Sequence, residues 1–262
     1  TKRDAFVVVI RDAESFARWA AEDGAALQWL EIHGLLGDPE VWRSAARIHC
    51  EIPLDVVVGD PAEEYAHLYR LVDVRAVRPI RVTIPVKPGF LKAFRLAASL
   101  QLPVRLLPGQ PAAEVHDELL EAVEFSLRDP MVEAPVEYFH SALVSMQTGD
   151  PGSLWSALEE DPAVYLRLDE SGNPERTSPA PGVKPADYVR DHVASVAAAG
   201  QCRDCPWLAF CGGYFKQPDP SYSCDGVLRV FEALHQATEE MRQDLSALEQ
   251  QTEKPGKGEQ AL

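Results

Sequence analysis

The stretch Leu54-Asp55-Val56-Val57-Val58-Gly59-Asp60-Pro61 holds the pattern that decides the fold. The β-branched run at 54–58 favours a short buried strand, and Gly59 ends it. Asp60 is a typical N-cap residue and Pro61 suits the first helical turn, so we expect a helix over 62–71. A continuous apolar run of this kind suits a parallel sheet that is covered on both faces.

The same strand-to-helix unit repeats on both sides of this stretch, at a spacing of roughly 25 residues. The expected strands cover 6–10, 27–33, 54–58, 80–86 and 104–107, and the expected helices cover 13–21, 39–48, 62–71, 90–100 and 112–127. Successive units of this kind predict an α/β fold with a parallel sheet. The open edges of a sheet with so few strands need a cover, which a partner, a second copy or the C-terminal helix would supply.

The regular alternation of strands and helices ends in the second half of the chain. Further elements are expected there: a helix over 136–147, a strand over 163–168 with a hairpin turn at 169–173, a helix over 184–199 and a long charged helix over 225–250. The length suits one large domain with a small appendage, or two modest domains. We therefore expect a βα domain at 1–150, a smaller domain at 151–250 and a disordered tail at 251–262.

The charge balance excludes several classes of partner. The 262 residues include 25 Lys and Arg against 41 Asp and Glu, a formal net charge of −16. Nucleic-acid binding and polybasic membrane contact both need clustered basic residues, so neither is expected. No apolar run approaches the roughly 20 residues of a spanning helix, and the run at 5–10 is too short for a signal peptide. We expect a cytoplasmic protein whose acidic surface favours a basic peptide or protein partner.

Four of the five cysteines crowd into the stretch 202–224. They are Cys202, Cys205, Cys211 and Cys224, with the spacing C-x2-C-x5-C-x12-C, whereas Cys50 stands alone. Without a secretory signal, such crowding indicates a metal site rather than disulfides or unrelated buried thiols. Four thiolates suit either a tetrahedral zinc ion or a 4Fe–4S cluster, and the spacing leaves both open.

The residues around the cysteines suit a bulky inorganic centre. Gly212-Gly213 would let the backbone pass close to it without a Cβ clash. Aromatic side chains would exclude water, and those expected to do so are Trp207, Phe210, Tyr214 and Phe215.

This stretch resembles the SPASM domain of the radical SAM enzymes, an extension that carries auxiliary iron–sulfur clusters and often serves enzymes that modify ribosomal peptides. The resemblance lies in the C-x2-C-x5-C run, the later cysteine and the sequence Cys211-Gly212-Gly213-Tyr214. It implies that the four cysteines hold one 4Fe–4S cluster. It also implies that the upstream units form a partial (β/α) barrel of about five to six parallel strands, and that 164–173 is the hairpin before a SPASM-like domain.

The departures from that family matter as much as the match. A further family cysteine is replaced by Phe215, and none follows the hairpin at 173–176. The C-x3-C-x2-C motif that holds the SAM-cleaving cluster in the family is missing after the first strand, where 11–15 reads Arg-Asp-Ala-Glu-Ser. The resemblance therefore implies one cluster, no S-adenosylmethionine and no SAM-cleaving reaction.

Four polar residues are weak catalytic candidates at the mouth of the expected barrel. They are Glu31 and His33 at the end of the second strand, Lys87 after the fourth and Arg105 in the fifth. Sites of parallel α/β barrels lie at the carboxyl ends of the strands. A hydrogen-bonded strand-end pair and a solvated rim are the plain structural alternatives for these residues.

Three functions fit these observations. The first is an iron–sulfur protein with an accessory or redox role, which binds a peptide or a partner protein in a peptide-modification pathway, inside a heteromeric modifying enzyme. The second is a stand-alone enzyme that acts at the barrel mouth with a metal cofactor. The third is a zinc-stapled structural module.

Overall fold

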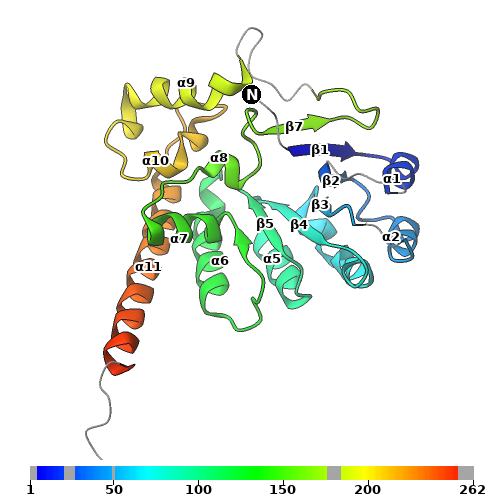
Figure 1. Cartoon of the computed structure of the whole chain (residues 1–262), viewed down its shortest axis with the longest axis horizontal. Coiled ribbons are helices and arrows are strands. Elements are labelled where there is room, and N and C mark those ends of the chain that lie inside the picture. The colour runs from blue at the N-terminus through cyan, green and yellow to red at the C-terminus, as the bar shows by residue number, and fades with distance from the viewer. Residues whose placement is uncertain (1–4, 21–26, 49–50, 176–183, 253–262) are drawn as a thin grey trace, which may run out of the picture.

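The fold is built on one sheet of seven parallel strands, seen in a computed structural model that describes residues 5–20, 27–48, 51–175 and 184–252. The strand order is β6-β5-β4-β3-β2-β1-β7 (Figure 1). The first six strands therefore lie side by side in their order along the chain, and β6 and β7 are the two edge strands. The strands are β1 Ala5–Ile10, β2 Leu27–His33, β3 Leu54–Val57, β4 Ile80–Pro85, β5 Val104–Leu107, β6 Val136–Glu137 and β7 Tyr165–Leu168. The predicted α/β class and parallel sheet are confirmed.

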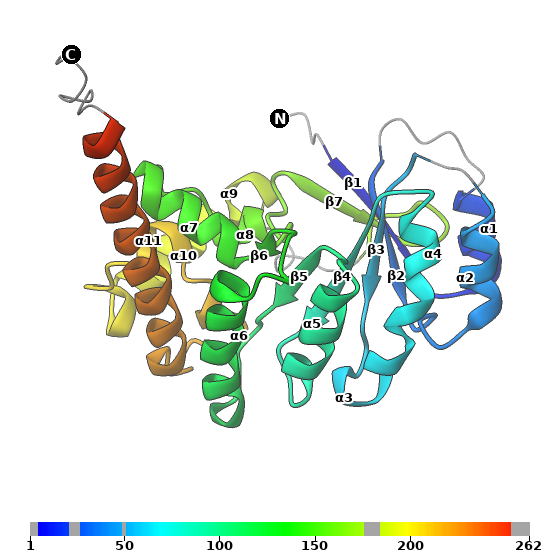
Figure 2. The same cartoon turned by 90° about the horizontal axis from the view of Figure 1, so that it is seen from below.

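Helices from the first half of the chain cover one face of this sheet (Figures 1 and 2). They are α1 Ala13–Ala20, α2 Pro39–Ala45, α3 Pro61–Glu64, the 3-10 helix η1 Tyr65–Leu71, α4 Val72–Arg75, α5 Phe90–Ser99, the 3-10 helix η2 Ala113–Val115 and α6 His116–Arg128. Three of them begin at a capping aspartate, as the sequence predicts for Asp60. The carboxylates of Asp12, Asp38 and Asp60 each accept a hydrogen bond from a backbone N–H two or three residues later, which satisfies a donor that the helix leaves unpaired.

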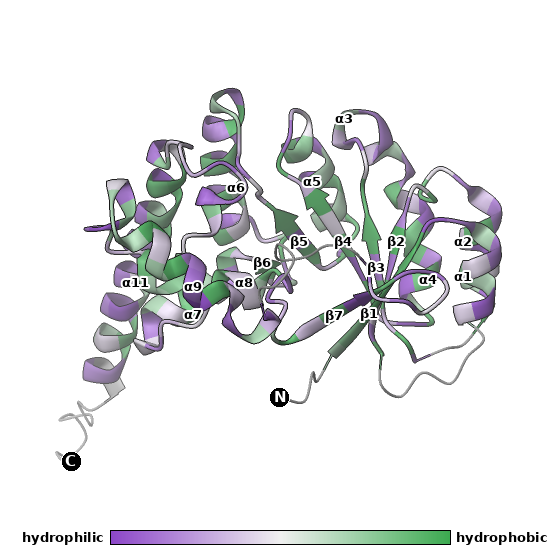
Figure 3. Ribbon diagram, turned by 90° about the horizontal axis from the view of Figure 1, so that it is seen from above, coloured by the Kyte–Doolittle hydropathy of each residue, from purple (hydrophilic) through white to green (hydrophobic). Residues whose placement is uncertain are grey.

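The strands bury apolar side chains mainly on the helical side, although Val7 and Val9 of β1 are also buried, on the other face. Val8, Ile32, Leu54 and Val56 are at most 1% exposed and belong to the main core. Figure 3 shows hydrophobic residues gathered on the strands and hydrophilic residues on the exposed sides of the helices. The second face is buried as well, as expected of a covered sheet, but its buried side chains are largely polar rather than apolar. Side chains alternate along a strand, and many of the alternate positions are charged.

One strand of the sheet, β6, is not expected from the sequence, and another, β7, lies in a different place from the one expected. Residues 136–137, expected to begin a helix, instead form β6 beside β5. The strand expected in a separate hairpin is β7, and it pairs in parallel with β1, placing Arg167 opposite Val7. The hairpin itself is reduced to one antiparallel bridge between Leu168 and Pro174. The region 151–250 thus contributes a strand to the sheet of the first 150 residues.

The remaining elements form a helical region beside β5 and β6 (Figures 1 and 2). They are α7 Phe139–Thr148, α8 Leu154–Ala157, α9 Pro185–Ala197, η3 Gly200–Cys202, α10 Leu208–Cys211, η4 Tyr214–Lys216 and α11 Asp225–Thr252. The N-terminal half of α11 buries Val227, Val230 and Leu234 against α6 and α7. Helix α11 extends two residues into the expected tail, and 253–262 lie outside the described residues. Among those described, no helix is both long and apolar enough to cross a membrane.

Candidate functional site

The four clustered cysteines line one cavity. Its volume is about 400 Å³ counted with the open space at its mouth, and its wall includes Cys202, Cys205, Cys211 and Cys224. The rest of the wall combines two polar side chains with apolar ones, chiefly Gln201, Lys216, Trp207, Leu208, Phe215, Val227, Leu228 and Phe231. The spacing therefore predicts correctly which side chains the fold gathers. Cys50 lies outside the described residues.

Short turns bring the cysteines together. The N–H of Cys205 donates to the carbonyl of Cys202 at 3.4 Å, and the N–H of Cys211 donates to that of Trp207 at 2.7 Å. A side chain holds the late cysteine near the others. Oε1 of Gln201 accepts a hydrogen bond from the N–H of Cys224 at 3.1 Å. The segment thus closes into a loop around the cavity before α11 begins.

The cysteines fit a metal centre in their chemistry. All four are free thiols rather than disulfides. Burial raises the pKa of Cys202 and Cys224, and it raises that of Cys211 to about 12. Thiolates at these positions therefore need a nearby cation, and a bound metal displaces the thiol protons.

Zinc and a 4Fe–4S cluster need different arrangements of the four sulfur atoms. Tetrahedral zinc holds every sulfur about 2.3 Å from one point. Among the residues that the structure describes, no three His, Cys, Asp or Glu side chains converge closely enough to hold one metal ion. A 4Fe–4S cluster binds one thiolate at each iron and so sets the sulfurs further apart. The shared cavity is compatible with either centre.

The aromatic shell differs in part from the prediction. Trp207 and Phe215 line the cavity, whereas Phe210 and Tyr214 lie buried behind it. The sequence analysis missed Phe231 on α11, whose ring centroid lies 5.9 Å from that of Trp207 and 6.2 Å from that of Phe215. Phe231 therefore joins α11 to the cysteine segment.

The structure gives the two glycines a reason beside the one expected, and Gly213 also lines the cavity. Gly212 and Gly213 have φ values of 59° and 68°, a conformation that favours glycine. A Cβ at Gly212 would lie 2.9 Å from the ring of Trp155, and one at Gly213 would lie 2.6 Å from Val196. Protein packing and the left-handed turn therefore account for both glycines.

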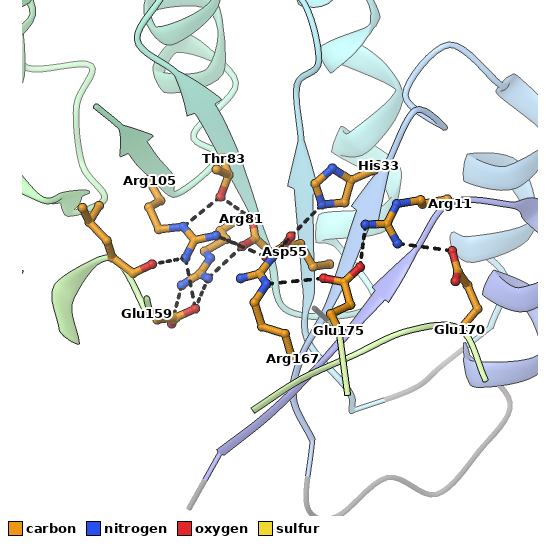
Figure 4. A network of polar contacts seen from close by, with 12 residues as sticks. Arg11, His33, Asp55, Arg81, Thr83, Arg105, Glu159, Arg167, Glu170 and Glu175 are labelled. Carbon is orange, nitrogen blue, oxygen red and sulfur yellow. Dashed lines mark hydrogen bonds and ion pairs between the residues drawn. The ribbon is translucent and has the colours of Figure 1, made fainter. Parts of the chain in front are cut away.

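A cluster of charged and polar side chains lies on the face of the sheet opposite the helices (Figure 4). We call this face of the sheet the inner face. Asp55 is fully buried there and accepts hydrogen bonds from Arg81 at 2.8 Å and from Arg105 at 2.6 Å. Thr83 donates to its other oxygen at 2.5 Å. Burial raises the pKa of Asp55, but the two guanidinium groups outweigh this and hold it below its ordinary value.

Glu159 closes this inner-face network from the loop between α8 and β7. One carboxylate oxygen accepts from Trp29 Nε1 at 2.9 Å and from Arg81 at 2.8 Å, and the other pairs with Arg105 at 3.3 Å. Its φ is 58°, which is unfavourable for a residue with a Cβ. The carboxylate thus holds strands β2, β4 and β5 to one loop.

The structure brings three of the four weak candidates together. Glu31 accepts from His33 at 2.6 Å and lies 3.6 Å from Arg105. It also pairs with Arg167 on β7. Burial raises the pKa of Glu31, but His33 and the arginines reverse this and hold it below its ordinary value. Lys87 is exposed in the turn before α5, apart from these contacts.

Sequence reasoning missed most of the inner-face network. Asp55 and Arg81 each sit between two apolar strand residues, and this alternation was the available signal. Arg167 lies in a strand whose neighbour was not predicted. Nothing local marks Glu159, because its partners are far from it in the chain.

The segment after α7 connects the two groups of residues. Trp155 Nε1 donates to the carbonyl of Gly212 at 3.0 Å, within the cysteine segment. Burial raises the pKa of Glu160, which is hydrogen-bonded to Tyr214 and senses the charges of Arg105 and Arg167. Neighbouring residues of one loop, Glu159 and Glu160, therefore face the inner-face network and the cysteine region respectively.

Comparison of this chain with protein-family models, with curated proteins and with solved structures finds no match. The geometry of the two groups of residues therefore carries the functional argument.

Proposed function

We propose that this chain is an iron–sulfur protein that resembles a SPASM-type radical SAM enzyme without its SAM-cleaving cluster. Its role is accessory or redox, in a pathway that modifies a peptide. Its ligands would be Cys202, Cys205, Cys211 and Cys224, which hold one 4Fe–4S cluster. The single observation that carries the proposal is that these four free thiols line the same cavity.

The four thiols and the largely apolar wall of the cavity support the cluster. When bound, such a cluster supplies one-electron transfer at a potential set by its surroundings. The chain supplies four sulfur ligands on short turns and an apolar wall. Trp207, Phe215 and Phe231 in that wall exclude water.

The inner face supports an accessory role over a stand-alone enzyme. Glu31 and Arg105, the candidates for acid–base work or anion binding, are bound to charged neighbours. A general base has to reach a substrate proton with a free acceptor. The stretch after β1 carries Arg11, which pairs with Glu175 at 2.6 Å, where the family carries cluster ligands. We therefore propose no S-adenosylmethionine binding.

The charge of the chain supports a basic partner. At −16, the chain attracts a basic peptide or a basic face of a modifying enzyme, and this attraction weakens as salt is added. Nucleic acid and an anionic membrane surface do not fit that charge.

Removing the ligands one at a time tests this proposal. Cys202→Ala, Cys205→Ala, Cys211→Ala and Cys224→Ala are compared with Cys50→Ala after anaerobic purification. We expect each of the four to lose iron and acid-labile sulfide, while Cys50→Ala keeps the wild-type content. Full iron content in two or more of the four variants would contradict the proposed ligand set. Stoichiometric zinc in place of iron would favour the zinc-stapled module.

A further inference from the structure

Lys216 is a buried ammonium in the wall of the cysteine cavity. The residue is 8% exposed and lines the cavity together with all four cysteines. It lies in η4, directly after the left-handed Gly213, and its N–H donates to the Gly213 carbonyl at 2.8 Å. The turn that follows Cys211 therefore directs this side chain inward.

The hydrogen-bond acceptors of Lys216 are neutral, and the charge of nearby Asp219 acts on it without a salt bridge. Its Nζ donates to Oε1 of Gln201 at 3.0 Å and to the backbone carbonyl of Tyr222, and both acceptors are neutral. Within the described ranges no carboxylate forms a salt bridge with it. The nearby carboxylate of Asp219 accepts from Ser221 instead, at 2.7 Å.

Gln201 fixes this ammonium relative to the ligands. The same Oε1 atom that accepts from Lys216 also accepts from the N–H of Cys224, and the Nε2 atom donates to Asp225 at 3.0 Å. The lysine and the late cysteine are thus held by one amide group. A charge in a fixed position acts on its surroundings without the cost of reorganisation.

Burying a cation without an anion is unfavourable. Four thiolates around a 4Fe–4S cluster carry a net negative charge, and reduction adds to it. A fixed positive charge stabilises both states, and it stabilises the reduced state more. Two of the three N–H donors of Lys216 are used by Gln201 and Tyr222, which leaves the third for the cavity.

Resting on the iron–sulfur function proposed above, we propose that Lys216 compensates the charge of the cluster in the cysteine cavity and raises its reduction potential. Lys216 is a positioning residue that sets the electrostatic potential of the cavity, and it takes no part in ligation. The sequence motif gave no sign of this role, because Lys216 lies between the third and fourth cysteines without being part of their spacing.

The test compares three variants of the full chain, purified anaerobically. Lys216→Met removes the charge and keeps the length of the side chain, and Lys216→Arg keeps the charge. Lys92→Met is the matched control, since Lys92 is exposed on α5 and donates to Tyr65 rather than to the cavity. Iron per chain and the midpoint potential of an EPR-monitored redox titration are measured for each.

We expect Lys216→Met to keep its iron and to become at least ten-fold harder to reduce, a shift of 59 mV to lower potential for a one-electron couple. The midpoint potentials of Lys216→Arg and Lys92→Met should differ from that of the wild type by less than this shift. Loss of iron in Lys216→Met but not in Lys216→Arg would also support the proposal that the charge of Lys216 compensates the charge of the cluster. An unchanged potential in fully loaded Lys216→Met would overturn this inference alone, whereas wild-type protein without iron would overturn the proposed function as well.

Discussion

Arg105 on β5 donates a hydrogen bond to Asp55 on β3 at 2.6 Å, although strand β4 lies between them. The contact forms above Thr83, which donates to the same carboxylate and accepts from Arg105 Nε at 3.0 Å. A polar inner face is therefore joined across three strands by side chains rather than by the backbone ladder alone. Arg81 from the intervening strand completes the set.

Loss of the Asp55 carboxylate should destabilise the fold strongly. Asp55→Ala leaves Arg81 and Arg105 buried with less counter-charge, and breaking a buried pair in this way costs about 3–5 kcal/mol. Urea unfolding followed by circular dichroism measures the change in the free energy of unfolding. Glu40→Gln is the control, because the exposed pair of Glu40 with Arg43 is worth only about 0–1 kcal/mol. Equal effects of the two substitutions would show that the inner-face network does not stabilise the fold.

The carboxylate of Asp55 should also affect how steeply the free energy of unfolding falls at acid pH. Because the folded-state pKa of Asp55 lies below its ordinary value of 3.8, its contribution is present above that value. It is lost as the pH falls through the lower folded pKa. Wild-type protein should therefore lose stability below about pH 4 more steeply than Asp55→Asn. Parallel acid limbs in urea titrations of the two proteins would contradict this assignment.

The contribution of Glu160 to stability should change with pH in the opposite direction to that of Asp55. Burial raises its folded-state pKa above the ordinary value of 4.5, so its contribution is present below that value and is lost as the pH rises through the folded pKa. Glu160→Gln removes this ionisation and keeps a partner for Tyr214. We expect the variant to be at least as stable as wild type at pH 7 and to lose that advantage near pH 4. A variant that is less stable at pH 7 than at pH 4, relative to wild type, would refute the raised pKa.

Glu159 allows backbone strain to be compared with side-chain contacts. Glu159→Gly relieves a left-handed conformation worth about 1–2 kcal/mol, but it removes the acceptor for Arg81, Arg105 and Trp29. We expect net destabilisation of about 1–4 kcal/mol. Gln101→Gly is the matched control, since exposed Gln101 has a φ of 55° and few contacts, and it should be neutral or stabilising. Stabilisation of both variants in thermal unfolding would mean that strain dominates at Glu159.

Local chemistry in the sequence was enough to predict the βα units. The caps at Asp38 and Asp60, each followed by proline, act within one helical turn, and so their effect can be read without knowing the fold. The position of β7 beside β1 could not be read in this way. The choice of partner for a four-residue strand depends on contacts more than 150 residues away.

The same contrast holds for the candidate sites. Spacing predicted that four cysteines share a cavity, since turns of two to five residues act locally. Lys216 and Phe231 were missed because the fold, not the motif, brings them to the cavity wall. Arg105 and Glu31 were noticed one by one, but their partners Asp55 and Arg167 meet them only on the assembled sheet.

The central claim is that the four cysteines hold a 4Fe–4S cluster. Quantitation of iron, acid-labile sulfide and zinc in anaerobically purified wild-type protein, with an EPR spectrum after reduction, tests it most directly. We expect about four irons and four sulfides per chain, little zinc and the EPR signal of a reduced cluster. One zinc per chain without iron, or no metal at all after reconstitution with iron and sulfide, would contradict it.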